Sequence, residues 1–225
     1  MFDTKSNAHK SPAYRWGALT LMAALAGIII ALGFQHISPY QLTIEPTTAF
    51  GRAFARGEWS PPDEDAAAAL YETTQAVLEG AGFEAYEVSN HARDMAARSA
   101  HNLHVWRGGD YLGVGPGAHG RLTLDGVRTA TVAHRRIGDY GTGVGAGTPW
   151  IEREALDPSG AAEERILLGL RTVEGAPIAA FEALGAEGRI AALVDDGFLT
   201  VVGDRAVATA RGRPVLDGVL KALLA

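Results

Sequence analysis

The chain of 225 residues contains no cysteine. Without thiols it can form no disulfide, bind no zinc through cysteine and carry out no thiol chemistry. The thiolate ligands of an ordinary iron–sulfur cluster are absent as well. The missing cysteine does not indicate a compartment, since a chain without thiols tolerates both oxidising and reducing surroundings.

Positive charge is also scarce. The chain carries 20 Lys and Arg against 26 Asp and Glu, a net charge of −6. Residues 150–225 repeat this bias, with eight basic and twelve acidic side chains. Because nucleic-acid binding relies on an excess of positive charge, we expect no nucleic-acid partner. The glycine-rich run at 138–147 is not followed by Gly-Lys-Ser/Thr, which excludes a phosphate-binding P-loop there.

Residues 16–34, WGALTLMAALAGIIIALGF, contain no charged side chain. As a helix, these 19 residues would be about 28 Å long, close to the hydrocarbon thickness of a bilayer. Lys5, Lys10 and Arg15 precede them and predict an N-in orientation. We therefore predict a single-pass membrane anchor over residues 1–35 and a membrane-anchored protein. A signal peptide and a buried core helix are the alternatives.

The next segment has the pattern of an α/β unit. Residues 40–44 alternate as a strand does, and Ser60 followed by two prolines and three acids is typical of a helix start. The helix would end near Gly80, and residues 83–88 would form the next strand. A strand, a helix and a strand in this order predict part of a parallel sheet.

The remainder predicts a hairpin and then a small helical domain. Residues 123–131 read as a β-hairpin around Asp125-Gly126, and residues 138–147 as a loop. From residue 151 we expect helices at 161–171, 178–184, 189–196 and 213–224. We also expect one hairpin, formed by residues 198–202 and 205–208. This order resembles a winged helix. Its acidic character favours a structural or protein-contact role over DNA binding.

Residues 101–121, HNLHVWRGGDYLGVGPGAHGR, form the most distinctive motif. A neutral imidazole such as that of His101 can donate a nitrogen lone pair to haem iron. An aromatic ring such as that of Trp106 can pack on a porphyrin face. Asn102 offers an amide that can orient the imidazole. These residue types are compatible with haem binding, which the family resemblance described next implies.

This motif and residues 36–46, HISPYQLTIEP, resemble the HemW-type haem chaperones, which are related to oxygen-independent coproporphyrinogen III oxidase in the radical-SAM family. The resemblance covers residues 36–225 and implies a partial radical-SAM barrel at 36–150 and a winged-helix-like domain at 151–225. It also implies haem as the bound molecule and a haem-accepting protein as a partner. The half of the family that holds the cluster cysteines is missing. An iron–sulfur cluster, S-adenosylmethionine and radical-SAM catalysis are therefore not expected here.

The resemblance implies roles for single residues. The family motif His-Asn-x-x-Tyr-Trp is associated with haem binding, which implies His101 as the metal ligand with Asn102 and Trp106 beside it. Val105 stands in place of the motif's Tyr. Further cofactor contacts are implied for Gly115, Gly117 and His119. In the structural alternatives, the histidine is a hydrogen-bonded scaffold residue and the glycines form a tight turn.

No catalytic residue is expected. Glu45 and Glu87 are placed at predicted strand ends, where active sites of α/β proteins gather, but two isolated carboxylates favour a structural hydrogen-bonding role.

Residues 10–37 resemble the first membrane helix of DsbB-like proteins, although the redox-active cysteine pair that follows in that family is absent. Both resemblances meet at His36-Ile37, which suggests a junction of two genes. Three functions remain open at this point: haem binding or haem trafficking, a membrane-anchored protein-interaction module, and a non-functional fusion product.

Overall fold

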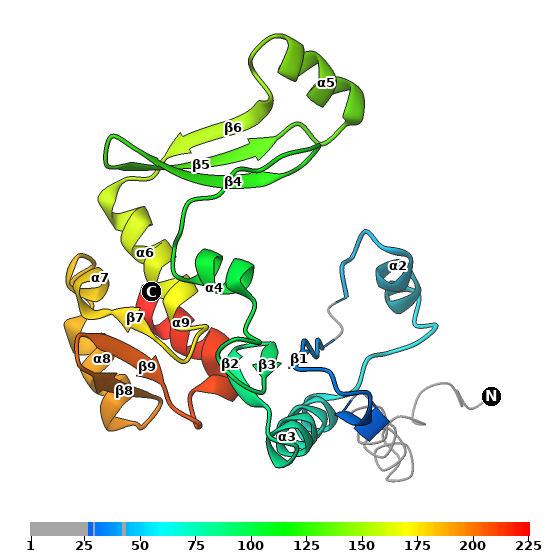
Figure 1. Cartoon of the computed structure of the whole chain (residues 1–225), viewed down its shortest axis with the longest axis vertical. Coiled ribbons are helices and arrows are strands. Elements are labelled where there is room, and N and C mark those ends of the chain that lie inside the picture. The colour runs from blue at the N-terminus through cyan, green and yellow to red at the C-terminus, as the bar shows by residue number, and fades with distance from the viewer. Residues whose placement is uncertain (1–26, 29, 42–43) are drawn as a thin grey trace. The chain divides into compact units, whose positions relative to one another are not determined.

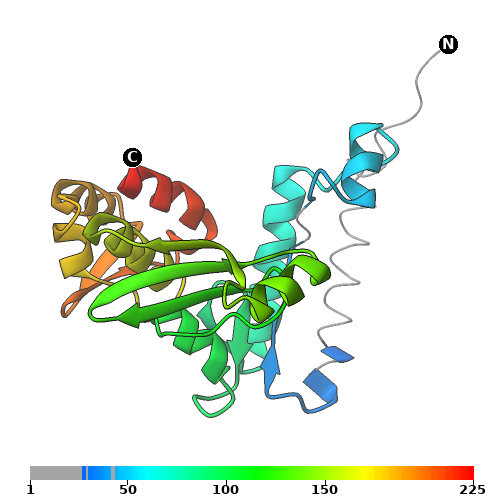
Figure 2. The same ribbon diagram turned by 90° about the horizontal axis from the view of Figure 1, so that it is seen from above.

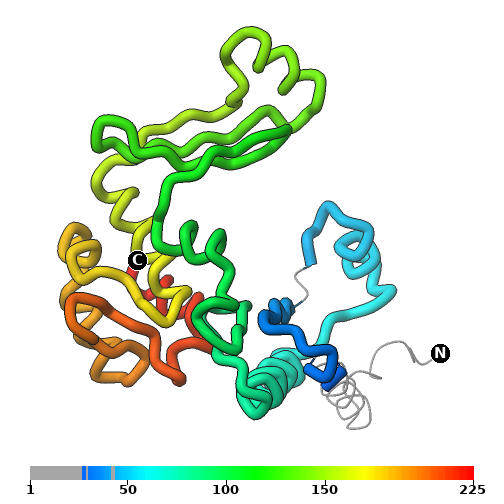
Figure 3. Tube along the Cα trace, in the orientation of Figure 1, coloured from blue at the N-terminus to red at the C-terminus, as the bar shows by residue number. Residues whose placement is uncertain are grey.

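The computed structural model describes residues 27–28, 30–41 and 44–225. It divides into two compact units, Met1–Arg98 and Ser99–Ala225. Figure 1 labels the helices and strands, and Figure 3 follows the same chain as a tube. The predicted boundaries at residues 35 and 150 stay predictions.

The first unit is a small antiparallel sheet beside one long helix. Its elements in chain order are β1 (His36–Ile37), α2 (Ala49–Ala55), α3 (Glu64–Gly80), β2 (Glu84–Glu87) and β3 (Asn90–Ala92). The sheet order is β1-β3-β2. The predicted long helix is present, but Asp63 is its N-cap, not Ser60, because the Asp63 carboxylate accepts a hydrogen bond from the Ala66 amide at 2.9 Å.

The parallel strand–helix–strand prediction is wrong for the described residues. Tyr40, Gln41 and Ile44 lie in no strand, and residues 42–43 lie outside the described part. The chain turns at Val88-Ser89 and returns as β3, which pairs antiparallel with β2. β1 then pairs with the other edge of β3, also antiparallel. The sheet of the described residues in this unit is therefore antiparallel throughout.

The second unit begins with α4 (Ala100–Trp106) and a three-stranded antiparallel sheet. The strands are β4 (His119–Leu124), β5 (Val127–Ala133) and β6 (Trp150–Ala155), in the order β4-β5-β6. The predicted hairpin is present. Its two turn residues, Asp125 and Gly126, both have positive φ, at 52° and 77°. This is the backbone that a two-residue turn between twisted strands requires.

The predicted loop at 138–147 is wrong, because Ile137–Gly145 forms helix α5. Figure 2 shows this helix at one end of the β4-β5-β6 sheet. Gly143 lies so close to the Thr148 carbonyl and to Pro149 that a side chain would not fit. The Thr148 amide also donates to the Gly143 carbonyl at 2.7 Å. Close packing therefore overrides the poor helix propensity of glycine here.

The rest of the second unit contains helices and a second antiparallel sheet, β7-β9-β8. The elements are α6 (Pro158–Gly169), β7 (Ala176–Pro177), α7 (Ile178–Glu182), α8 (Glu187–Asp195), β8 (Leu199–Val202), β9 (Arg205–Ala208), a short 3-10 helix (Arg213–Val215) and α9 (Leu216–Leu224). Fully buried apolar side chains form the core, including Ile166, Leu170, Phe181 and Leu223. The predicted helices and hairpin are present, while the winged-helix assignment stays a prediction.

Within residues 27–28, 30–41 and 44–225, no helix has the length and apolar character needed to cross a membrane. This finding contradicts the predicted membrane anchor over residues 16–34. The predicted membrane partner and membrane localisation are corrected with it. Of that segment, residues 16–26 and 29 lie outside the described part. The described part is helical only as far as Ala31, because Gly33 takes a positive φ of 79° that ends the helix.

Candidate functional site

Helix α4 carries the predicted haem motif. The Ser99 hydroxyl caps it by accepting a hydrogen bond from the Asn102 amide at 3.2 Å. His101 follows in the first turn and is exposed. Among the described residues, its imidazole has no hydrogen-bond or ion-pair partner. Both ring nitrogens of His101 are therefore accessible to a ligand.

The helix does not place Trp106 beside His101. Five helical residues correspond to a rotation of about 140°, so the two side chains leave α4 in different directions. Asn102 and Trp106, four residues apart, share one face. Trp106 is half-buried, with the Arg171 guanidinium 5.9 Å from its ring centroid. Asn102 and Trp106 thus share a helix face that does not include His101.

His104 lies one turn after His101, but its role is structural. Its Nε2 atom is 2.8 Å from the Asp110 carbonyl oxygen, to which it donates as the N–H tautomer. Its ring packs so closely over Gly109 that a side chain there would overlap it. His104 therefore fixes the turn that follows α4.

The glycine-rich segment after α4 returns the chain to the sheet. Tyr111 and Arg121 exchange two backbone hydrogen bonds of 2.7 and 2.9 Å. Gly113 lies against the His119 carbonyl, and Gly120 lies against the Thr131 hydroxyl. Gly113 and Gly120 are required because neighbouring chain fills the space of a side chain.

The predicted cofactor contacts Gly115 and Gly117 form a turn with φ of 109° and 72°. The Gly115 amide donates to the Tyr140 hydroxyl at 3.1 Å, and the Gly117 amide donates to the His134 carbonyl at 2.9 Å. His119 is exposed at the start of β4. These bonds explain the two glycines as turn residues, and the cofactor role of all three residues stays a prediction.

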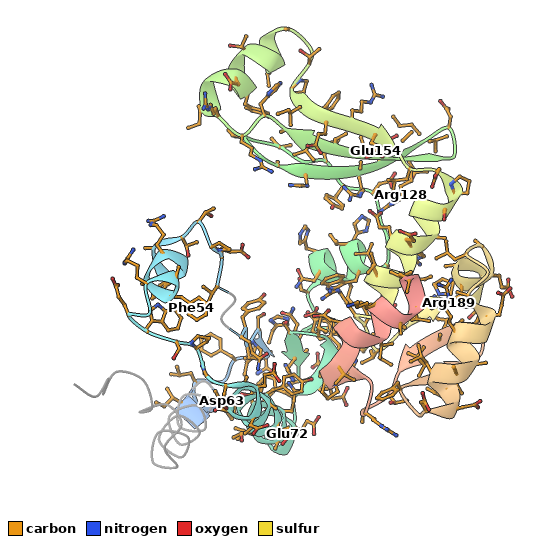
Figure 4. All side chains as sticks on the ribbon, turned by 180° about the vertical axis from the view of Figure 1, so that it is seen from behind. Phe54, Asp63, Glu72, Arg128, Glu154 and Arg189 are labelled. Carbon is orange, nitrogen blue, oxygen red and sulfur yellow. The ribbon has the colours of Figure 1, made fainter. Side chains whose placement is uncertain are left out.

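A network of arginines holds the C-terminal end of α4, and the sequence reasoning missed it. The two carboxylate oxygens of Glu164 on α6 accept hydrogen bonds from Arg121 at 2.5 Å and from Arg128 at 2.6 Å. Arg128 also donates to the Gly108 carbonyl at 3.0 Å, and Arg165 donates to the Arg107 carbonyl. Figure 4 labels Arg128 close to α6. The hairpin register, which places both β-strand arginines on one sheet face, was the available signal.

Electrostatics in this network favour the ionised carboxylate. Burial alone would raise the pKa of Glu164, but hydrogen bonds from Arg128 and Arg121 outweigh it and hold the pKa below its usual range. The pKa of Arg165 is lowered by burial and then by the like charges of Arg205 and Arg128. Positive charge is thus concentrated around Glu164, whose carboxylate pairs with Arg121 and Arg128, while Asp110 also pairs with Arg128 at 3.3 Å.

In the first unit, Glu87 is buried and accepts hydrogen bonds from the Asn90 side chain and the Ser89 amide. Asn90 in turn accepts from Ser38. Glu45 is exposed. The arrangement supports the structural role expected of Glu87. In the described part of the chain, no group of three or more His, Asp and Glu could by itself hold a metal ion.

The sequence is similar to that of known proteins of one family. Residues 156–215 match the HemN C-terminal domain. The chain is 39% identical over 196 residues to the haem chaperone HemW of Mycobacterium tuberculosis, covering 87% of this chain and 49% of that protein. It is 34% identical over 207 residues to HemW of Escherichia coli, covering 87% of this chain and 51% of that protein. The chain therefore spans about half the length of the curated relatives it matches.

A solved structure has a similar fold. Coproporphyrinogen III oxidase (HemN) of Escherichia coli, a radical SAM enzyme, matches with a TM-score of 0.68 over 91% of this chain and 51% of its own. At 17% identity this match establishes a similar mixed α/β fold. The chain therefore belongs to the HemW family. The comparisons give no support to the DsbB-like resemblance of residues 10–37.

Proposed function

From its similarity to one half of the HemW-type haem chaperones, we propose that this chain binds haem as cargo and takes part in its transfer. The observation that carries the proposal is the exposed His101 imidazole on a capped helix, with both ring nitrogens accessible. Haem brings its own four nitrogen ligands, so one protein imidazole suffices to bind its iron. A haem-accepting protein is the corresponding partner.

The surroundings of His101 favour one ligand on this helix. His104 is occupied through Nε2 by the Asp110 carbonyl. Val105, four residues after His101, lies on the same helix face and is half-buried. Its apolar side chain can contact a porphyrin bound at His101, whereas Trp106 is turned away. The position where the family has Tyr thus supplies an apolar contact here.

The names of several relatives also refer to S-adenosylmethionine. The residues of this chain do not fit an iron–sulfur cluster, because they include no cysteine to supply thiolate ligands. No step of the proposed function passes through such a cluster.

A haemin titration of the full chain tests the proposal through its Soret absorbance. We expect saturable binding that His101→Ala weakens at least tenfold, which corresponds to about 1.4 kcal/mol. His119→Ala is titrated in parallel, since it removes the second exposed imidazole for which a cofactor contact is predicted, outside α4. Equal affinity of the wild type and His101→Ala would refute the assignment. A loss confined to His119→Ala would move the ligand to β4.

A further inference from the structure

Arg165 on α6 and Arg205 on β9 are two arginines that lack an acidic partner. They are called the arginine pair below. In the described part of the chain, neither guanidinium forms an ion pair or a hydrogen bond with an Asp or Glu side chain. Helix α6 packs against β7, and β7 pairs with β9, which brings the two side chains into one region of the second unit. Figure 1 labels these elements.

Backbone carbonyls hold the arginine pair in place. Arg165 donates to the Arg107 carbonyl just beyond α4. Arg205 donates through Nε to the Glu174 carbonyl at 2.6 Å and through Nη2 to the Gly175 carbonyl at 2.5 Å. A backbone carbonyl carries no net charge, so these hydrogen bonds orient the two guanidinium groups without neutralising them.

The acidic side chains nearby are already paired with other arginines. The ion pairs around the arginine pair are Arg107–Glu174, Arg121–Glu164, Arg128–Glu164 and Arg128–Asp110. Three carboxylates thus balance three arginines. The arginine pair adds two positive charges to this neutral network, in a chain whose net charge is −6.

The two guanidinium groups of the arginine pair are close enough to repel each other. Burial lowers the pKa of Arg165 most, and the charges of Arg205 and Arg128 lower it further. Glu174 raises that pKa by less than either arginine lowers it. Exposed like charges turn away from each other in water, whereas the carbonyl contacts keep these two near each other. An anion bound between them would replace the repulsion with two attractive contacts.

The arginine pair keeps hydrogen-bond donors that are open to solvent. A guanidinium carries five N–H donors. Arg165 uses its Nη1 atom, and Arg205 uses its Nε and Nη2 atoms, in the contacts with the carbonyls. The Nε and Nη2 atoms of Arg165 and the Nη1 atom of Arg205 have no acceptor among the described residues, and none of these nitrogens is completely buried. They can therefore donate to a ligand that approaches from solvent.

We propose that the arginine pair binds an oxyanion, namely the carboxylate or phosphate group of a small molecule. A guanidinium presents parallel N–H donors that match two oxygens of either group. Both side chains are half-buried, which reduces the screening of their charges by salt. Residues 150–225 carry eight basic and twelve acidic side chains, which disfavours an extended polyanion such as a nucleic acid.

Calorimetric titration of the full chain with inorganic phosphate, and in parallel with succinate, tests the oxyanion site. We expect one saturable site for at least one of these anions. Its dissociation constant should rise at least tenfold in Arg165→Gln, because this variant removes one charge of the arginine pair together with its donors. Arg153→Gln is the matched control, since it removes an exposed arginine of the second unit that likewise forms no ion pair among the described residues. Its affinity should equal that of the wild type.

Three results would overturn the inference: saturable binding of neither anion, equal affinities of the wild type and Arg165→Gln, and an equal loss in Arg153→Gln. If Arg165→Gln does not fold, the unfolding of the wild type decides. An anion that binds only the folded chain raises its stability. The urea midpoint should therefore rise with phosphate or succinate at constant ionic strength, and a midpoint that neither anion changes would reject the site.

The oxyanion site does not depend on the haem proposal, so His101→Ala should leave the affinity for either anion unchanged. Haemin titrated while phosphate or succinate saturates the site shows where the oxyanion comes from. A weakened haemin affinity would mean that a propionate group of haem uses the arginine pair. An unchanged haemin affinity would mean that a separate small molecule does. Both results support the oxyanion site and differ only in its source.

Discussion

Replacing Glu164 by Gln is expected to lower the free energy of unfolding by about 3 kcal/mol. The carboxylate bridges Arg121 and Arg128, and the three side chains are only 17%, 24% and 15% exposed. Without it, Arg121 would lose its ion-pair partner, and Arg128 would keep only the longer contact of 3.3 Å with Asp110. The Nη2 atom of Arg128 already lacks a hydrogen-bond partner among the described residues. A urea titration of the full chain measures the change.

The neighbouring Glu163→Gln provides the control, because Glu163 lies on the same helix and is exposed. It should change stability by less than about 0.5 kcal/mol. Equal stability of the two variants would show that the bridging carboxylate contributes nothing beyond its surface charge.

The same carboxylate predicts a pH dependence. Because its folded pKa lies below its unfolded value, its contribution is fully present above the unfolded pKa and is lost as the pH falls through the folded pKa. Stability should therefore decrease below about pH 4, near the ordinary pKa of Glu. Glu164→Gln should flatten that decrease. If the variant loses stability below about pH 4 as steeply as the wild type, the pH dependence comes from other groups.

The second large effect is expected at Gly175, where substitution by Ala should cost about 2 to 5 kcal/mol. Gly175 has a positive φ of 74°, and a Cβ there would overlap the Ala206 carbonyl on β9. Its own carbonyl accepts a hydrogen bond from Arg205 at 2.5 Å. The backbone can neither change its φ nor move away without breaking this contact. Thermal or urea unfolding of the variant tests the cost.

Gly203→Ala separates the cost of a positive φ from the cost of the overlap with the Ala206 carbonyl. Gly203 has a similar positive φ of 60°, but nothing lies within 4 Å of the position of its Cβ. Its substitution should lower the free energy of unfolding only by the cost of placing alanine at a positive φ, about 1 to 2 kcal/mol. If Gly175→Ala costs no more than Gly203→Ala, a small backbone shift relieves the overlap with Ala206, and the overlap contributes nothing to the loss of stability.

Local signals predicted several elements well. Asp125-Gly126 predicted a two-residue hairpin turn, and both residues adopt the required positive φ. The helix after residue 60 was also recognisable, although its cap is Asp63. Such features depend on a few neighbouring residues, and for that reason sequence alone can predict them.

Features that depend on tertiary contacts were not predictable. The helix at Ile137–Gly145 contradicts the propensity of its glycines, because Gly143 packs closely against the returning backbone at Thr148 and Pro149 and against the His134 ring. The antiparallel pairing of β1 with β3 depends on where the chain turns after β2. At the candidate site, the motif identified His101, but only the helix geometry showed that Trp106 is on another face.

The anchoring of α4 is unequal along its length. Arg128 and Arg165 hold the carbonyls just beyond its C-terminal end, whereas the capping hydroxyl of Ser99 accepts from its N-terminal turn. His101 lies in that less strongly held turn. Fraying would therefore start at the His101 end and leave the arginine contacts intact. A cargo bound at His101 could then be released by opening one helical turn, at far lower cost than unfolding either compact unit.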